Sequence, residues 1–140
     1  SQEALDLAKR NFRNLAINSK VSFHLGDWCQ PLYPFLIGKV DLIVANPPYI
    51  PKNHLRELDA LVSKNEPHLA LYGGEDGMNP SRKIINGAIN CLSSGGWLIF
   101  EHHFDQSERA LEMLLNAGFL EVNFKNDFQG IRRFAIGRHP

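Results

Sequence analysis

The sequence has few of the features that mark several classes of protein. It contains two cysteines, Cys29 and Cys91, which stand far apart, so neither a disulfide framework nor a cysteine-based zinc site is indicated. The longest apolar run lies within Asp41-Leu-Ile-Val-Ala and is far shorter than the ~20 residues that cross a bilayer. We therefore expect no membrane segment, a cytoplasmic location and two buried, reduced cysteines.

The sequence also lacks an excess of charge of either sign. Lysine plus arginine and aspartate plus glutamate each number 15, so the formal net charge is zero. A strongly basic surface, which would favour nucleic-acid binding, is therefore not indicated. We expect no direct contact with nucleic acid. Apolar residues make up 44% of the 140 residues, enough for one domain with a sizeable core over residues 1–140.

The hydrophobic pattern predicts a series of helices and strands. An amphipathic helix is expected over residues 3–17, followed by a strand over 21–25 and a strand over 40–45 that is buried on both faces. A long irregular stretch follows, with a short helix around 53–62. The remaining elements are a helix from Asn79 (N-cap) to Gly95-Gly96, a strand over 97–100, a helix that begins with an Asp105–Glu108 capping box and ends at Gly118, and two strands, 120–124 and 132–137.

This order of elements predicts an α/β fold. Helices and strands alternate along most of the chain, which favours a sheet of parallel strands. The last two strands flank a turn at residues 127–130 and are expected to form a C-terminal antiparallel hairpin.

The clearest candidate site is the motif Asn46-Pro-Pro-Tyr, directly after the strand over 40–45. In open α/β sheets, ligands bind just outside the carboxyl ends of strands. Pro47 and Pro48 keep the backbone stiff and extended, so its carbonyls stay free to accept hydrogen bonds. The Asn46 side chain and the Pro47 carbonyl can together hold a nitrogen that bears two hydrogens, and Tyr49 can form a flat wall. The alternative is a plain turn, since Asn and Pro are common in turns.

With other motifs, Asn46-Pro-Pro-Tyr resembles the HemK-type protein-(glutamine-N5) methyltransferases of peptide chain release factors, which use S-adenosylmethionine. Asn-Pro-Pro-Tyr alone also resembles DNA adenine methyltransferases, so the wider pattern matters. That pattern consists of Glu66-Pro67, Ala70-Leu71, Gly74-Glu-Asp-Gly77, Arg82-Lys-Ile-Ile, Gly95-Gly96, Glu101, Phe119, Asp127, Gly130 and Arg132-Arg133.

The resemblance implies a Rossmann-like class I methyltransferase sheet with the strand order three-two-one-four-five-seven-six. Residues 21–25 and 40–45 would then be its third and fourth strands. The first two strands, the glycine-rich loop and the acidic residue that holds the ribose would be missing, because the chain begins at Ser1 inside a predicted helix. Residues 1–140 would be the C-terminal part of a single catalytic domain, and we expect this piece alone to be inactive.

The resemblance also implies roles for individual residues. The Asp27 carboxylate would accept a hydrogen bond from the adenine amine of S-adenosylmethionine, and Trp28 would stack on the ring. Asn46 would contact both cofactor and substrate. Asn46 and Pro47 would be catalytic, and Pro48 and Tyr49 would complete the substrate site. Without the resemblance, a capped turn with a core tryptophan is the favoured interpretation of Asp27 and Trp28.

Three other functions stay open. A methyltransferase of a ribosomal-protein glutamine would use the same chemistry, and an adenine-N6 DNA methyltransferase would share the motif at residues 46–49. A non-catalytic remnant of the fold would lack the cofactor. His102-His103 stands where small residues are more usual in the family, and it is not expected to bind a metal, since neighbours on a strand point to opposite faces.

Overall fold

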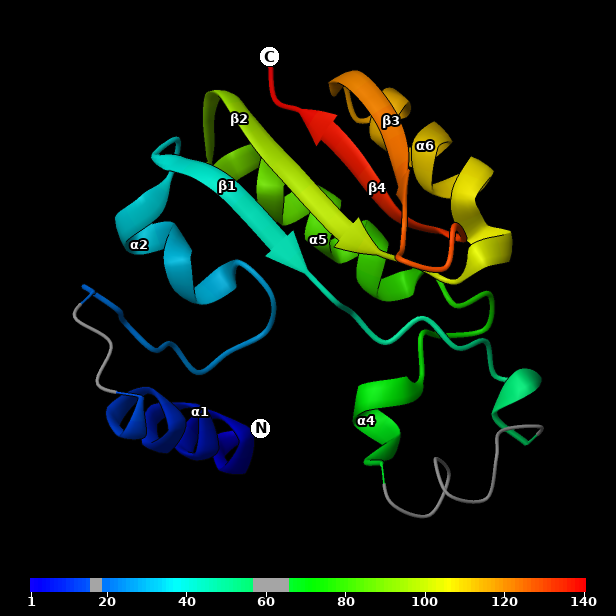
Figure 1. The fold of residues 1–140 in the computed structure, drawn as a ribbon. Coiled ribbons are helices and arrows are strands. Elements are labelled where there is room, and N and C mark those ends of the chain that lie inside the picture. The colour runs from blue at the N-terminus through cyan, green and yellow to red at the C-terminus, as the bar shows by residue number, and fades with distance from the viewer. Residues whose placement is uncertain (16–18, 57–65) are drawn as a thin grey trace.

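The computed structural model describes residues 1–15, 19–56 and 66–140 (Figure 1). Its strands are β1 (Val40–Ala45), β2 (Leu92–Glu101), β3 (Leu120–Asn126) and β4 (Arg132–Arg138). Its α-helices are α1 (Gln2–Asn14), α2 (Tyr33–Leu36), α4 (His68–Leu71), α5 (Asn79–Cys91) and α6 (Ser107–Asn116), with short 3₁₀ turns at η1 (Gln30–Leu32), η2 (His54–Arg56) and η3 (Phe104–Gln106). Among these described helices, none has the length and apolar character needed to span a membrane.

The four strands form one mixed sheet in the order β1-β2-β4-β3. β1 and β2 are parallel, whereas β4 runs antiparallel to both β2 and β3. The predicted α/β class and the C-terminal hairpin are therefore confirmed. The observed order also equals the four-five-seven-six part of the strand order that the family resemblance implies.

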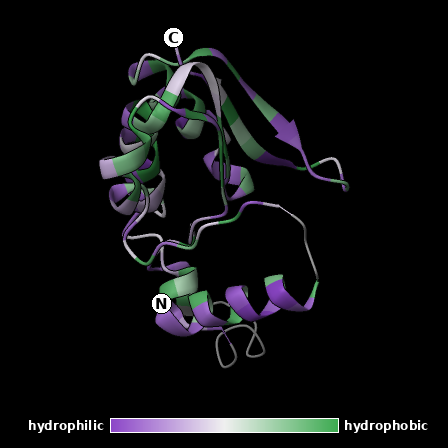
Figure 2. Cartoon of the chain, turned by 90° about the vertical axis from the view of Figure 1, so that its left-hand side faces the viewer, coloured by the Kyte–Doolittle hydropathy of each residue, from purple (hydrophilic) through white to green (hydrophobic). Residues whose placement is uncertain are grey.

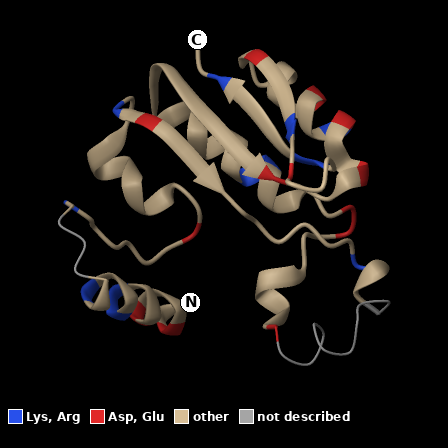
Figure 3. Cartoon of the chain, in the orientation of Figure 1, with Lys and Arg blue, Asp and Glu red and all other residues tan. Residues whose placement is uncertain are grey.

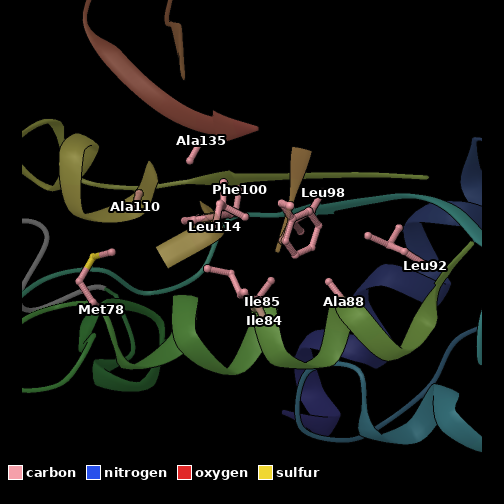
Figure 4. Packing of buried hydrophobic residues seen from close by; sticks show 11 residues of the cluster. Met78, Ile84, Ile85, Ala88, Leu92, Leu98, Phe100, Ala110, Leu114 and Ala135 are labelled. Atoms are coloured by element: carbon pink, nitrogen blue, oxygen red, sulfur yellow. The ribbon is translucent and has the colours of Figure 1, made fainter. Parts of the chain in front are cut away.

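The core lies between the sheet and helices α5 and α6 (Figure 4). Leu98 and Phe100 alternate along β2, so both point toward the helices, where Ile84 and Ile85 of α5 and Leu114 of α6 meet them. All five side chains are buried. Burial of each of these side chains stabilises the fold by about 1.5–3 kcal/mol. This packing holds β2, and the end of β1 beside it, against the helices.

The opposite face of the sheet is uncovered by the described residues. Leu42 and Val44 of β1 are 53% and 69% exposed. They lie in register with Trp97 and Ile99 of β2, which are only partly buried. The prediction that residues 40–45 are buried on both faces is thus wrong for one face. Among the described residues, no strand pairs with the free edge of β1.

Helix α1 confirms the amphipathic helix predicted over 3–17, although it ends at Asn14 with Leu15 as its C-cap. Residues 16 and 17 lie outside the described part. The Ser1 hydroxyl caps it by accepting from the Ala4 amide at 3.2 Å. The helix that begins at the N label in Figure 2 is α1, and it carries both hydrophilic and hydrophobic residues. None of the residues of α1, all of which are described, is buried.

The strand predicted over residues 21–25 is wrong. This segment is irregular and runs apart from the sheet (Figure 1). Its alternation of apolar and polar residues suits a strand, but a strand also needs a neighbour to accept and donate its backbone hydrogen bonds. Phe23 instead meets Phe12 of α1 edge to face, with ring centroids 5.8 Å apart. Val21 and Leu25 remain half exposed.

Helix α5 is shorter than predicted at its end. It stops at Cys91, because Leu92 turns to an extended backbone and begins β2. Gly95 and Gly96 therefore lie inside β2. A Cβ at Gly96 would come 2.9 Å from the Val40 carbonyl oxygen, so this glycine permits the close approach of β1 to β2.

Three other boundaries also differ from the prediction. Met78, not Asn79, is the N-cap of α5. The capping box lies at His103 and Gln106, ahead of the predicted pair Asp105 and Glu108, since α6 begins only at Ser107. The short helix expected around 53–62 lies mostly outside the described residues. The part that is described contains the 3₁₀ turn η2. The glycine predicted to end the following helix is confirmed: Gly118 has a positive φ of 85° directly after the cap of α6.

Candidate functional site

The segment 46–49 (Asn46, Pro47, Pro48 and Tyr49) leaves the carboxyl end of β1 and enters a loop. The side chain of Asn46 is exposed, whereas Pro47 is buried. All four residues line a cavity of about 350 Å³, together with Ile50, Ala70 and Leu71. This volume lies at the lower end of the range of small-molecule sites. The structure thus places all four predicted substrate residues around one cavity at the strand end where α/β proteins bind ligands.

Backbone hydrogen bonds fix the far end of this segment. The amide of Ile50 donates to the Leu71 carbonyl at 3.0 Å, and the amide of Gly73 donates to the Ile50 carbonyl at 2.9 Å. Ile50 and Tyr72 form an isolated parallel bridge. The two prolines exclude a helix after Asn46, so the chain extends until it meets this bridge. Ala70 and Leu71 of helix α4 therefore form one wall of the cavity.

Tyr49 is held by its hydroxyl group. Its Oη donates to Oε1 of Glu101 at 3.0 Å, at the end of the neighbouring parallel strand β2. Burial, followed by the hydrogen bond to Glu101, raises the pKa of Tyr49, so the phenol stays neutral and donates. Its ring lies 6.2 Å from that of His103. Tyr49 lines the cavity as expected, and it also connects the ends of β1 and β2.

A second cavity, of about 390 Å³, lies next to the first. Its walls include Asp27 and Trp28, the predicted adenine-binding pair, and Pro48 of the segment 46–49. The other lining residues are Gly26, Leu69, Tyr72, Gly73, Gly74, Asn79, Pro80 and Lys83. Because Pro48 lines both cavities, the predicted cofactor and substrate residues come together at this one proline. Of these two cavities, Asn46 lines only the first. The second cavity therefore does not include the predicted contact between Asn46 and the cofactor.

Trp28 is both a core residue and a cavity wall. It packs against the hydrophobic core, which matches the core-tryptophan alternative, and it lines the second cavity. Its φ of 53° lies in the left-handed region, which costs a non-glycine residue of order 1 kcal/mol. Its Nε1 atom is buried without a hydrogen-bond partner in the described part of the chain. An aromatic wall of this kind suits a ligand with a flat ring.

The Asp27 carboxylate faces Lys83 of α5, whose Nζ lies 3.3 Å from Oδ2. Both side chains are more than half exposed, so this ion pair contributes little to stability. A carboxylate has two acceptor oxygens, and Lys83 contacts one of them. The second remains suited to accept from an amine. An acceptor beside an aromatic ring in one cavity fits the adenine part of S-adenosylmethionine.

Several lining residues carried no signal of their own in the sequence. Lys83, Ala70, Leu71 and Gly74 belong to the motifs of the family resemblance but had no assigned role. Nothing in the sequence marks Gln106, which the structure places behind Tyr49. Basic and acidic residues are interspersed along the described elements (Figure 3).

The chain has close relatives over essentially all of its length. It is 56% identical over 138 residues to a release factor glutamine methyltransferase of Prochlorococcus marinus, which covers 99% of the chain and 47% of that protein. By sequence, the chain is similar to proteins named release factor glutamine methyltransferase. Proteins of the same name match from Coxiella burnetii (36% over 140 residues, 99% of the chain and 47% of that protein) and Thermosynechococcus vestitus (37% over 142 residues, 100% and 48%). The chain spans about half the length of these family members, and no family model matches it.

Solved structures agree with the fold alone. A candidate DNA modification methylase of Thermus thermophilus superposes with a TM-score of 0.54 at 17% identity, over 84% of this chain and 53% of that one. A protein of Bordetella parapertussis described as a possible exported protein gives a TM-score of 0.60 at 16% identity, over 100% and 51%. At these identities the matches support the mixed α/β architecture of the chain and say nothing of its substrate.

Proposed function

We propose that the chain is the C-terminal part of a single catalytic domain that methylates the side-chain amide nitrogen of a glutamine in a peptide chain release factor, in the cytoplasm. The names of its relatives support the reaction class and the substrate. The strand order β1-β2-β4-β3, which equals the four-five-seven-six part of the expected order, supports a Rossmann-like class I sheet. The observation that carries the proposal is Pro48, which lines both cavities.

We assign the first cavity to the substrate amide. A glutamine amide nitrogen is a poor nucleophile, since its lone pair is delocalised into the carbonyl. The Asn46 side-chain oxygen and the Pro47 carbonyl would each accept one of its two hydrogens and so orient the nitrogen. Orientation of this kind supplies several kcal/mol, up to ~7–11 in ideal intramolecular reactions. The stiff backbone of Pro47 and Pro48 keeps the acceptors in place without further ordering.

We assign the second cavity to S-adenosylmethionine, which when bound supplies an electrophilic methyl group. Asp27 would accept from its adenine amine, Trp28 would stack on the ring, and Asn46 would lie at the border with the substrate. Pro48 lines both cavities and would keep water away from their junction. Hydrogen bonds to the substrate amide are stronger where water is excluded.

Transfer of a labelled methyl group tests this proposal. The complete gene product that carries this chain is incubated with methyl-labelled S-adenosylmethionine and, in separate reactions, a release factor, ribosomal proteins or DNA. We expect label on one glutamine of the release factor. Label on a ribosomal-protein glutamine would keep the chemistry but change the substrate, whereas label on adenine in DNA would overturn the assignment. A protein that neither binds the cofactor nor transfers a methyl group would be a non-catalytic remnant.

A further inference from the structure

Gln106, the last residue of η3, is a buried side chain that connects three segments of the chain. It is only 5% exposed. Its Nε2 donates to the Tyr49 carbonyl at 3.0 Å and to the Asp76 carbonyl at 3.5 Å. Its Oε1 accepts from the backbone amide of His103 at 3.0 Å. One side-chain amide thus joins the segment 46–49, the loop at 73–77 and the start of α6.

The three partners determine the orientation of this amide. Two of them are carbonyl oxygens, which only accept, and the third is a backbone N–H, which only donates. The nitrogen end of Gln106 must therefore face Tyr49 and Asp76, and both of its hydrogens are used. No other residue type of the same size offers two donors and an acceptor in this arrangement. The contact therefore depends on direction and not only on volume.

Close packing leaves this contact no freedom to shift. Gly77 has a φ of +75°, and a Cβ built on it would lie 2.3 Å from Nε2 of Gln106 and 2.4 Å from the carbonyl oxygen of Tyr49. A Cβ on Gly73 would lie 2.8 Å from Cα of Tyr49. The backbone of Tyr49 is thus enclosed by the two glycines and fixed by Gln106, while Glu101 fixes its hydroxyl.

We infer that Gln106 is a positioning residue for the methyl transfer, which holds the carbonyl of Tyr49 and thereby sets where Asn46 and Pro47 present their oxygens. The inference rests on the proposed function for its activity measurement. Tyr49 is three residues from Asn46, and Pro47 and Pro48 between them are stiff. A displacement of the Tyr49 backbone is therefore passed on to the oxygens that face the substrate. A shift of ~1 Å in such groups costs on the order of 100-fold in rate.

Two variants of Gln106 in the complete gene product separate this role from simple space filling. Gln106→Met has a similar shape but neither donors nor acceptor, and we expect it to lower kcat on the order of 100-fold with little change in the KM of the cofactor. Gln106→Glu keeps the acceptor for His103 but turns a carboxylate oxygen toward two carbonyls, so we expect a greater loss than for Met. The same two substitutions at Gln129, which is exposed in the β3–β4 turn, are the matched controls.

Hydrogen exchange gives a measurement that needs no activity. The amides of Ile50 and Gly73 should exchange faster in both Gln106 variants, while amides in the middle of α6 keep the wild-type rate. Wild-type kcat and wild-type exchange at Ile50 and Gly73 in Gln106→Met would overturn the inference. If the wild-type protein transfers no methyl group, the proposed function is overturned instead. The exchange rates of the Ile50 and Gly73 amides would still decide whether Gln106 holds Tyr49.

Discussion

The hydroxyl of Tyr49 donates a hydrogen bond to the carboxylate of Glu101 across 3.0 Å, although the two residues are 52 positions apart in the sequence. This bond connects the segment that follows β1 with the end of the parallel strand β2. It joins Gln106 in fixing Tyr49 at two points. The segment 46–49 is therefore held by side chains that come from outside its own motif.

Removal of the Tyr49 hydroxyl should weaken this end of the sheet. We expect Tyr49→Phe to lower the free energy of unfolding by about 1 kcal/mol, the net value of a typical hydrogen bond, because Glu101 loses its donor. Urea unfolding of the complete gene product measures the change. The matched control is Tyr72→Phe, whose ring lies 5.3 Å from His68. Equal stabilities for the wild type and Tyr49→Phe would show that the bond contributes nothing.

Asp76 makes part of the stability dependent on acid. The hydrogen bonds from Arg82, at 3.1 and 2.5 Å, hold the pKa of Asp76 down, from an ordinary value of 3.8 to about 2. A lowered pKa in the folded state stabilises the protein above the unfolded value, and this stabilisation is lost as the pH falls through the folded value. We expect the Tm of the wild type to fall between about pH 3.8 and 2.

The variant Asp76→Asn tests the origin of that slope. It should have a lower Tm than the wild type at neutral pH and a shallower decrease in acid, since the titrating carboxyl is gone. Asp6→Asn, on the exposed helix α1, is the control. An acid dependence in Asp76→Asn as steep as that of the wild type would assign the effect to other carboxylates.

Trp28 is predicted to contribute directly to cofactor binding. Trp28→Ala should weaken binding of S-adenosylmethionine by about 1–3 kcal/mol, by analogy with bases stacked on aromatic side chains. Trp28→Phe keeps a ring at this position and should recover part of the affinity. Calorimetry decides: an unchanged affinity in Trp28→Ala would mean that the side chain serves only the core.

Residues 1–140 expressed alone should bind S-adenosylmethionine weakly or not at all. Leu42 and Val44 remain exposed on β1, and hydrophobic strands without a cover or a neighbour favour aggregation and weaken cooperativity. Titration with the cofactor and a thermal unfolding scan of this piece provide the check. Micromolar binding together with a sharp transition would show that these residues are sufficient by themselves.

The sequence predicted the elements whose stability is local or whose partners are close in the chain. The stripe of α5 and the hairpin of β3 and β4 carry their own periodicity, and the structure confirms them. The prediction of a strand over residues 21–25 was wrong because a strand depends on a neighbouring strand, which its own residues do not reveal. The predicted end of α5 was wrong because Gly95 and Gly96 lie in β2, where Gly96 permits the close approach of β1, and do not end the helix.

The candidate site follows the same division. Asn46 and the two prolines after it are recognisable from the motif alone, and Asp27 and Trp28 from the resemblance. The structure adds that Pro48 lines both cavities. The roles of Lys83 and Gln106 were not predictable, because both depend on contacts with residues more than 50 positions away.

The most direct test of the central claim is the turnover of Asn46→Ala with a release-factor glutamine as substrate. Asn46 is exposed at the end of β1 and lines the first cavity, so its removal should leave the fold and the walls of the second cavity unchanged. A hydrogen bond made mainly in the transition state affects kcat more than binding. The account predicts that Asn46→Ala transfers no measurable methyl group while it binds S-adenosylmethionine nearly as well as the wild type. Turnover close to that of the wild type would contradict it.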